Sequence, residues 1–353
     1  MLAADCLPAT AIRAPQRLAT LPDRDWDLLI RQGRRANLLA RIAYLARAGK
    51  HWETLPTAPR GHLQAAETLA ARQVQAIRHE LKKLAEALDS AGLRAVLLKG
   101  AAYLAADLPC AQGRLFGDID LMVPKPQLAL AESALMLHGW AAGHHDEYDQ
   151  RYYRRWMHEV PPLQHVTRLS IIDLHHAILP ETARAPSPAA PLFQASIPLP
   201  GTPFLVLSPI DMTLHSATHL FHEGEFHNGL RDLCDLDSLL RHFSAQEPEF
   251  WQDLADRAAE LNLSASLRHA LRYTQQVFGT PVPDAFCPKR RAFVDALFAR
   301  ALAPEHASCS DVWSPLARWL LYLRGHWLRM PLHLLIPHLL HKALPRREGK
   351  AGG

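Results

Sequence analysis

The stretch of sequence that decides the fold is LFGDIDLMV, residues 115–123. It places two aspartates two positions apart inside a segment that is otherwise apolar and strand-like, although aspartate is depleted from strands. Alternate side chains of an extended chain share a face, so we expect Asp118 and Asp120 on one face and Ile119 and Leu121 on the other. Two anions on one face repel each other unless a cation lies between them. Oxygen ligands alone favour Mg²⁺ or Mn²⁺ over Zn²⁺. The alternative is a solvated strand end with two incidental aspartates.

The composition is that of an ordinary globular protein. The chain has 353 residues, 48% of them hydrophobic and 21% charged, so it is long enough for about two domains and a sizeable core. The net charge of +4 and the pI near 8.8 are compatible with anionic ligands, nucleic acid or a membrane surface, without choosing among them. Nucleic acid is not specifically indicated.

Targeting and redox signals favour a cytoplasmic protein. The five cysteines are scattered and form no CxxC pair, which argues against a disulfide framework or a thiolate zinc site. The first residues show no basic region followed by an apolar one, so no secretory signal is predicted. No uncharged apolar run reaches the roughly 18 to 20 residues that would cross a bilayer.

Hydrophobic periodicity predicts an α+β protein with a small mixed-sheet core between helical regions. Strand signals occur only between about residues 92 and 180, where 94–100 and 118–123 read as strands and 158–178 as a hairpin. Seven prolines between Pro180 and Pro203 suggest an extended connection. The expected organisation is an N-terminal helical region (1–91), the mixed core (92–180), a Pro-rich connection (181–205), a C-terminal helical domain (206–345) and a disordered tail (346–353).

Two basic residues and a glycine near the first strand suit an anionic ligand. Gly100 lets the backbone approach a ligand closely, and the helix that follows it offers free N–H groups to a phosphate. Lys99 adds positive charge, and Arg114 precedes the aspartate pair. Lys99 could instead be a solvated strand terminus, and Arg114 a structural ion-pair partner of Asp118.

A third acid completes the pattern. Asp173 lies in another apolar strand, on the same face as His175. If its strand is the neighbour of the first, Asp118, Asp120 and Asp173 form a cluster that can hold two Mg²⁺ ions for an in-line displacement at phosphorus. Asp173 could instead be a strand-end acid paired with an arginine. His175 could pack in the core or support a neighbouring ligand.

In their order along the chain these residues resemble the nucleotidyltransferase superfamily that includes DNA polymerase β and the aminoglycoside nucleotidyltransferases. Within it, they are most similar to an uncharacterised bacterial nucleotidyltransferase family. The motifs that carry the resemblance are Leu98-Lys99-Gly100, Arg114, Asp118-Ile119-Asp120-Leu121 and Asp173-Leu174-His175. The chain departs from the superfamily pattern in having Ala101 after the glycine and a longer spacer, residues 102–117, before the first aspartate.

The resemblance implies a nucleotidyltransferase that uses an NTP such as ATP. Asp118, Asp120 and Asp173 would bind the metal ions, Asp173 would help to activate the acceptor hydroxyl, and Lys99, Gly100 and Arg114 would bind the nucleotide. The acceptor, a small molecule, sugar or protein, is not specified by the sequence. The alternative, suggested by the two departures, is a catalytically silent nucleotide-binding or interaction module of the same fold.

Three further segments carry weaker signals. His215, His219 and His222 fall on a predicted helix, where core or capping roles are favoured over a zinc site because no glutamate follows the first histidine. Asp232 and Asp235 suit a solvated helix face. Residues 312–344 are apolar but contain arginines; packing against the helical domain is favoured, with peripheral membrane contact as the alternative.

Overall fold

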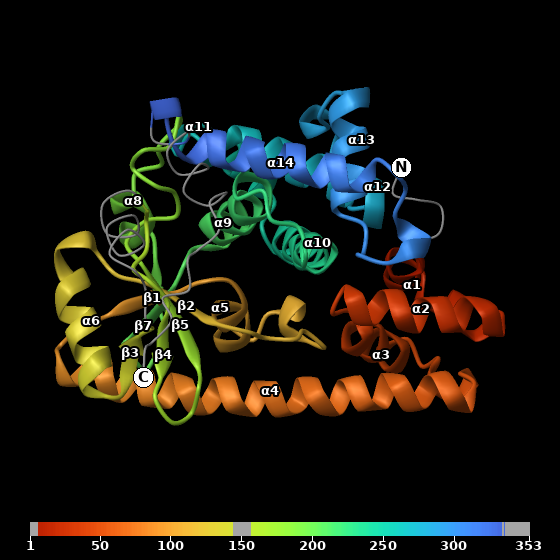
Figure 1. Cartoon of the computed structure of the whole chain (residues 1–353), viewed down its shortest axis with the longest axis horizontal. Helices are drawn as coiled ribbons and strands as arrows, with labels where there is room; N and C mark the ends of the chain where they lie inside the picture. The colour runs from red at the N-terminus through yellow and green to blue at the C-terminus, as the bar shows by residue number, and fades with distance from the viewer. Residues whose placement is uncertain (1–5, 144–156, 334, 336–353) are drawn as a thin grey trace, which may run out of the picture.

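The computed structural model describes residues 6–143, 157–333 and 335 (Figure 1). The tail expected at 346–353 lies outside these residues. One mixed sheet lies at one end of the molecule, and helices surround it, which confirms the α+β fold predicted from the sequence. In the described part of the chain, no helix is both long and apolar enough to cross a membrane.

The sheet has seven strands in the order β3-β4-β5-β2-β1-β7-β6. Their bounds are β1 Ala95–Leu97, β2 Ile119–Met122, β3 Trp140–Ala142, β4 Leu163–His165, β5 Ile171–His175, β6 Ile197–Pro198 and β7 Phe204–Val206. The central strand β2 runs antiparallel to β1 and parallel to β5. Every residue of β1 and β2 is buried, as expected for central strands covered on both faces.

The register of β2 on β5 positions the candidate site. Asp120 is the direct partner of Asp173, and Ile119 is that of Ile172. Period-two alternation therefore puts both aspartates on one face and both isoleucines in the apolar core.

The helix α4 (Thr57–Ser90) connects the N-terminal helices to the sheet. Leu63, Ala70, Ile77 and Leu84 recur every seven residues, about two helical turns, and all four are buried. At 1.5 Å per residue its 34 residues span about 50 Å. Figure 1 shows it running beneath both the sheet and the N-terminal helices.

The remaining helices form two groups. The N-terminal group is α1 (Leu7–Arg13), α2 (Asp23–Arg35) and α3 (Leu39–Ala48). Beside the sheet lie α5 (Lys99–Ala105), α6 (Leu128–Leu137) and the short α8 (Ala190–Gln194). The C-terminal group is α9 (Pro209–His222), α10 (Gly229–Gln246), α11 (Phe250–Glu260), α12 (Ser264–Phe278), α13 (Ala292–Ala301) and α14 (Ser314–Arg329). Ser208 caps α9 by accepting a hydrogen bond from the backbone N–H of Asp211.

The Pro-rich segment is part of the sheet, so the expectation that strands occur only between 92 and 180 was wrong. β7 pairs in parallel with β1, and β6 pairs with β7 at the edge. Pro198 is tolerated because it lies in the edge strand, where its missing N–H costs no ladder hydrogen bond. The sequence did not predict β6 and β7, because they are very short, lie among prolines and are stabilised only by pairing within the sheet.

The helix α14 packs against the C-terminal helices, as favoured for 312–344, but its apolar stripe faces outward. Trp313, Leu316, Trp319 and Trp327 are exposed, while the opposite face, with Ala317, Leu321 and Gly325, is buried. That face approaches the turn after α9 so closely that a Cβ on Gly325 would lie 2.3 Å from the carbonyl oxygen of Glu223.

The arginines of α14 are engaged inside the protein. Arg318 pairs with Glu305 at 3.7 Å, and Arg324 donates to the carbonyl oxygen of Phe221 at 2.8 Å. Both side chains therefore already have partners within the protein. Membrane contact of this segment stays a prediction.

One ion pair joins α4 to the β4–β5 hairpin, and its loss should destabilise the protein. The buried Glu80 accepts hydrogen bonds from Arg168 at 2.6 and 3.1 Å and from Ser170 at 2.9 Å. We expect Glu80→Ala to lower the free energy of unfolding by about 2 kcal/mol. Urea denaturation followed by circular dichroism measures this change.

Glu86→Ala is the matched control on the same helix, because Glu86 forms an exposed pair with Lys83, and such surface pairs contribute little to stability. Burial raises the pKa of Glu80, but Arg168 and Ser170 outweigh it and lower the pKa below 4.5. The stabilisation is therefore present above pH 4.5 and is lost as the pH falls through the lowered pKa. Equal effects of the two variants at neutral pH would contradict this account.

Candidate functional site

Three carboxylates meet where β2 and β5 run side by side. Oxygen atoms of Asp118, Asp120 and Asp173 all lie within 4.8 Å of one another. Asp118 is exposed just before β2, Asp120 is buried within it, and Asp173 is half-buried on β5. The parallel pairing of the two strands brings together residues that are more than fifty positions apart.

Asp120 is held as an anion by Lys99 and His175. Its Oδ1 accepts from Lys99 Nζ at 2.9 Å and lies 3.2 Å from His175 Nε2. Burial favours the neutral acid, but the charge of Lys99 and the hydrogen bond to His175 outweigh burial and hold the pKa of Asp120 well below its usual value. Lys99 is thus an ion-pair partner and not a solvated strand terminus.

Lys99 reaches this position through an unusual backbone conformation. It lies two residues after the end of β1 and has a φ of 45°, in the left-handed region that residues other than glycine seldom adopt. The backbone N–H of Leu98 still donates to the carbonyl of Asp120, so the chain leaves the sheet immediately afterwards and begins α5. Such strain persists only where surrounding contacts impose it, and it is concentrated at functional sites.

Asp173 is left without compensation. Its Oδ1 is buried and has no hydrogen-bond partner among the described residues. Burial, followed by the charges of Asp120 and Asp118, raises the pKa of Asp173 to about 8. A divalent cation among the three carboxylates would satisfy the orphaned oxygen and relieve the repulsion, so the residues present fit such an ion.

Arg114 does not pair with Asp118 but with α10. Its Nε donates to Asp235 at 2.8 Å, and Asp232 lies 4.0 Å from Nη2. Both partners in the close pair are buried, so the prediction that Asp235 lies on a solvated helix face was wrong. Gly100 leaves room for this arginine, since a Cβ there would lie 2.5 Å from Arg114 Nη1.

A cavity of about 400 Å³ opens over the carboxylates. Its floor is formed by α5, β2 and β5, and its other walls by residues of the α9–α10 turn and the end of α14. All six site residues predicted from the sequence line it: Lys99, Gly100, Arg114, Asp118, Asp120 and Asp173.

The cavity also contains residues that the sequence analysis did not assign. His158, Glu159 and Glu223 carry no local motif, because each joins the site only through tertiary contacts. Burial raises the pKa of Glu223 to about 7, and its carboxylate lies 3.2 Å from His219. The i, i+4 spacing of His219 and Glu223 was the one signal that could have indicated this pair.

The other histidines of α9 belong to the core. Burial lowers the pKa of His215 to about 3 and that of His222 to about 4, so both rings are neutral. Within the described part of the chain, neither belongs to a group of residues with metal-ligand geometry. The favoured interpretation of these residues as core histidines agrees with their burial.

Comparisons with known proteins identify the family. A search of the curated proteins and a search of the solved structures each found no match. The family model of the uncharacterised nucleotidyltransferases matches residues 22–279, which include the sheet, the carboxylates and helices α9 to α12. The chain therefore belongs to this nucleotidyltransferase family.

Proposed function

We propose that this protein transfers a nucleoside monophosphate from an NTP to a hydroxyl group of a small molecule, sugar or protein. The observation that carries the proposal is the close approach of Asp118, Asp120 and Asp173, with an orphaned carboxylate oxygen on Asp173. The acceptor oxygen would form a bond to the α-phosphorus while the bond to pyrophosphate breaks. Membership of a nucleotidyltransferase family supports the same reaction.

The three carboxylates would hold Mg²⁺ or Mn²⁺, because their donors are oxygens only. When bound, the ion supplies positive charge to the phosphate oxygens. Asp173 would accept the proton of the acceptor hydroxyl, since its Oδ1 has no hydrogen-bond partner among the described residues and faces the same cavity. Lys99 keeps Asp120 ionised, and Arg114 with Gly100 forms the wall of the cavity on which we place the nucleotide.

The competing hypothesis is a catalytically silent nucleotide-binding module. Ala101, which is buried, offers no hydroxyl to a triphosphate, and this departure from the superfamily pattern motivates that hypothesis. The uncompensated Asp173 favours the enzyme, because a silent module gains nothing from burying a carboxylate beside two others.

Replacing a single carboxylate should abolish transfer. We expect Asp120→Asn and Asp173→Asn each to reduce label transfer from α-labelled NTPs, in the presence of Mg²⁺ and cell extract, by at least about 100-fold. Asp107→Asn is the matched control, because Asp107 is exposed after α5 and its φ of 51° suits asparagine equally well. Tight NTP binding by the wild type with no transfer to any acceptor would favour the silent module.

A second test concerns the space under Arg114. Gly100→Ala should displace the guanidinium from Asp235 and lower the free energy of unfolding by about 1–3 kcal/mol. Gly117→Ala is the control, because a Cβ at Gly117 meets nothing within 4 Å; its effect should stay within about 0.5 kcal/mol. Denaturant titration of both variants measures the difference. An unchanged stability of Gly100→Ala would mean that Arg114 has room to move.

A further inference from the structure

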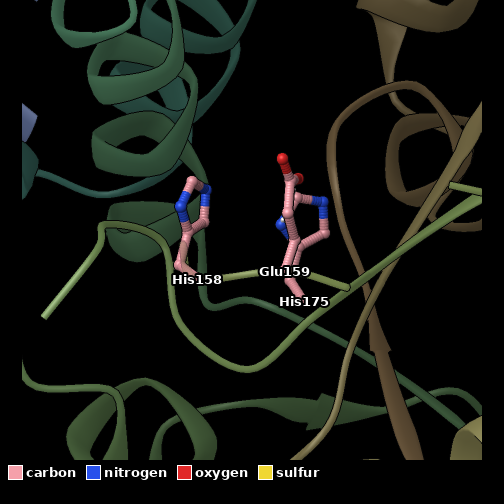
Figure 2. A group of neighbouring side chains, drawn as sticks. All are labelled: His158, Glu159 and His175. Carbon is pink, nitrogen blue, oxygen red and sulfur yellow. Dashed lines mark ion pairs between the residues drawn. The ribbon is translucent and has the colours of Figure 1, made fainter. Parts of the chain in front are cut away.

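A second group of potential ligands lies in the same cavity, beside the carboxylates. One donor atom each of His158, Glu159 and His175 lies within 4.8 Å of the other two. Figure 2 shows the three side chains extending in the same direction from neighbouring segments of the chain. Among the described residues, this is the one group with such geometry that contains imidazole nitrogens.

The backbone holds these residues in register. Glu159 and His175 form an isolated antiparallel bridge, and the N–H of His176 donates to the carbonyl of His158 at 2.8 Å. The segment that contains His158 and Glu159 therefore extends the ladder of β5 beyond the hairpin. This pairing fixes the side chains of both segments against each other without help from a ligand.

The spacing of two donors matches a tetrahedral ion. His175 Nδ1 lies 3.3 Å from Glu159 Oε2. Two ligands at about 2.0–2.1 Å from Zn²⁺ lie roughly 3.3–3.4 Å apart in a tetrahedral site. A metal ion would take the place of the proton that these two atoms share.

The other ring nitrogen of His175 is already oriented by a carboxylate. Nε2 lies 3.2 Å from Asp120 Oδ1, so a proton on Nε2 leaves the Nδ1 lone pair to a metal ion that displaces the proton shared with Glu159. This is the carboxylate–histidine–metal arrangement that fixes the tautomer and orientation of ligating histidines.

His158 has unused ligand capacity. It is 5% exposed, its ring lies 5.4 Å from that of His175, and its Nδ1 is buried with no hydrogen-bond partner among the described residues. A neutral imidazole has a nitrogen lone pair to offer to a metal.

We propose that His158, Glu159 and His175 form a separate site for a divalent transition metal ion such as Zn²⁺. Two imidazoles and one carboxylate favour such an ion over Mg²⁺. Three protein ligands leave a fourth tetrahedral position for water or a ligand oxygen in the cavity. The site is chemically distinct from the all-oxygen cluster and joined to it through the contact between His175 and Asp120. It does not depend on the proposed nucleotidyl transfer.

Binding of Co²⁺, a spectroscopic substitute for Zn²⁺, tests the proposal. Full-length protein freed of metal with a chelator is titrated with Co²⁺ in excess Mg²⁺ and without NTP. We expect one equivalent to bind with the intense visible absorption of four-coordinate Co²⁺, and Zn²⁺ to displace it. His158→Gln and Glu159→Gln should each weaken binding by about tenfold or more.

Two variants serve as controls. His222→Gln should leave Co²⁺ binding unchanged, because His222 is also buried with an unpartnered nitrogen but does not line this cavity. Asp118→Asn should also retain the absorption, even where it abolishes transfer, so failure of this proposal and failure of the proposed function are distinguishable. Circular dichroism establishes that each variant is folded.

Three outcomes would overturn the proposal. The first is that the wild type does not show the intense absorption when Co²⁺ is added. The second is that His158→Gln and Glu159→Gln both keep the absorption. The third is that Asp118→Asn loses it. If both ligand variants fail to fold, chemical modification of the wild type decides the matter. Zn²⁺, but not Mg²⁺, should then protect the peptide that contains His158 and Glu159 from carbethoxylation, and equal modification with either ion would exclude the site.

Discussion

The pairing of Asp120 with Asp173 across two parallel strands is the constraint on which the rest of the site depends. The register of β2 on β5 cannot shift by one residue without moving the isoleucines out of the core, so the core imposes the approach of the two acids. Asp120 has Lys99 and His175 as partners for its negative charge. The Oδ1 of Asp173 has no hydrogen-bond partner among the described residues. This imbalance of charge is what makes the site suited to a cation.

The surrounding helices engage one cation of the cavity wall in an ion pair of its own. Arg114 is paired with Asp235 of α10 and rests on the bare backbone of Gly100. Along the far wall, α14 approaches the turn after α9 through Gly325 and Gly224, which lets it close over Glu223. The cavity is thus formed by contacts between segments that are distant in sequence, and they fix its residues before any ligand arrives.

What the sequence predicted was local. The long helix α4, the hairpin before Ile178 and the strand predicted at 118–123, which the structure begins at Ile119, follow from periodicity within one segment. What it missed depends on partners elsewhere. The ion pair between Arg114 and Asp235 spans 121 positions, and the strands β6 and β7 are too short to show alternation.

His158 and Glu159 illustrate why some residues of the site could not be predicted from the sequence. They are neighbours in sequence, so their side chains would point apart in a regular strand. Only the isolated bridge to His175 brings donors of both near one ring. Since that ring also contacts Asp120, a cation bound on one side of His175 changes the charge that Asp120 experiences on the other. The imidazole therefore couples an oxygen-only ligand set to a mixed nitrogen–oxygen set, and any account of metal binding in this cavity has to treat the two together.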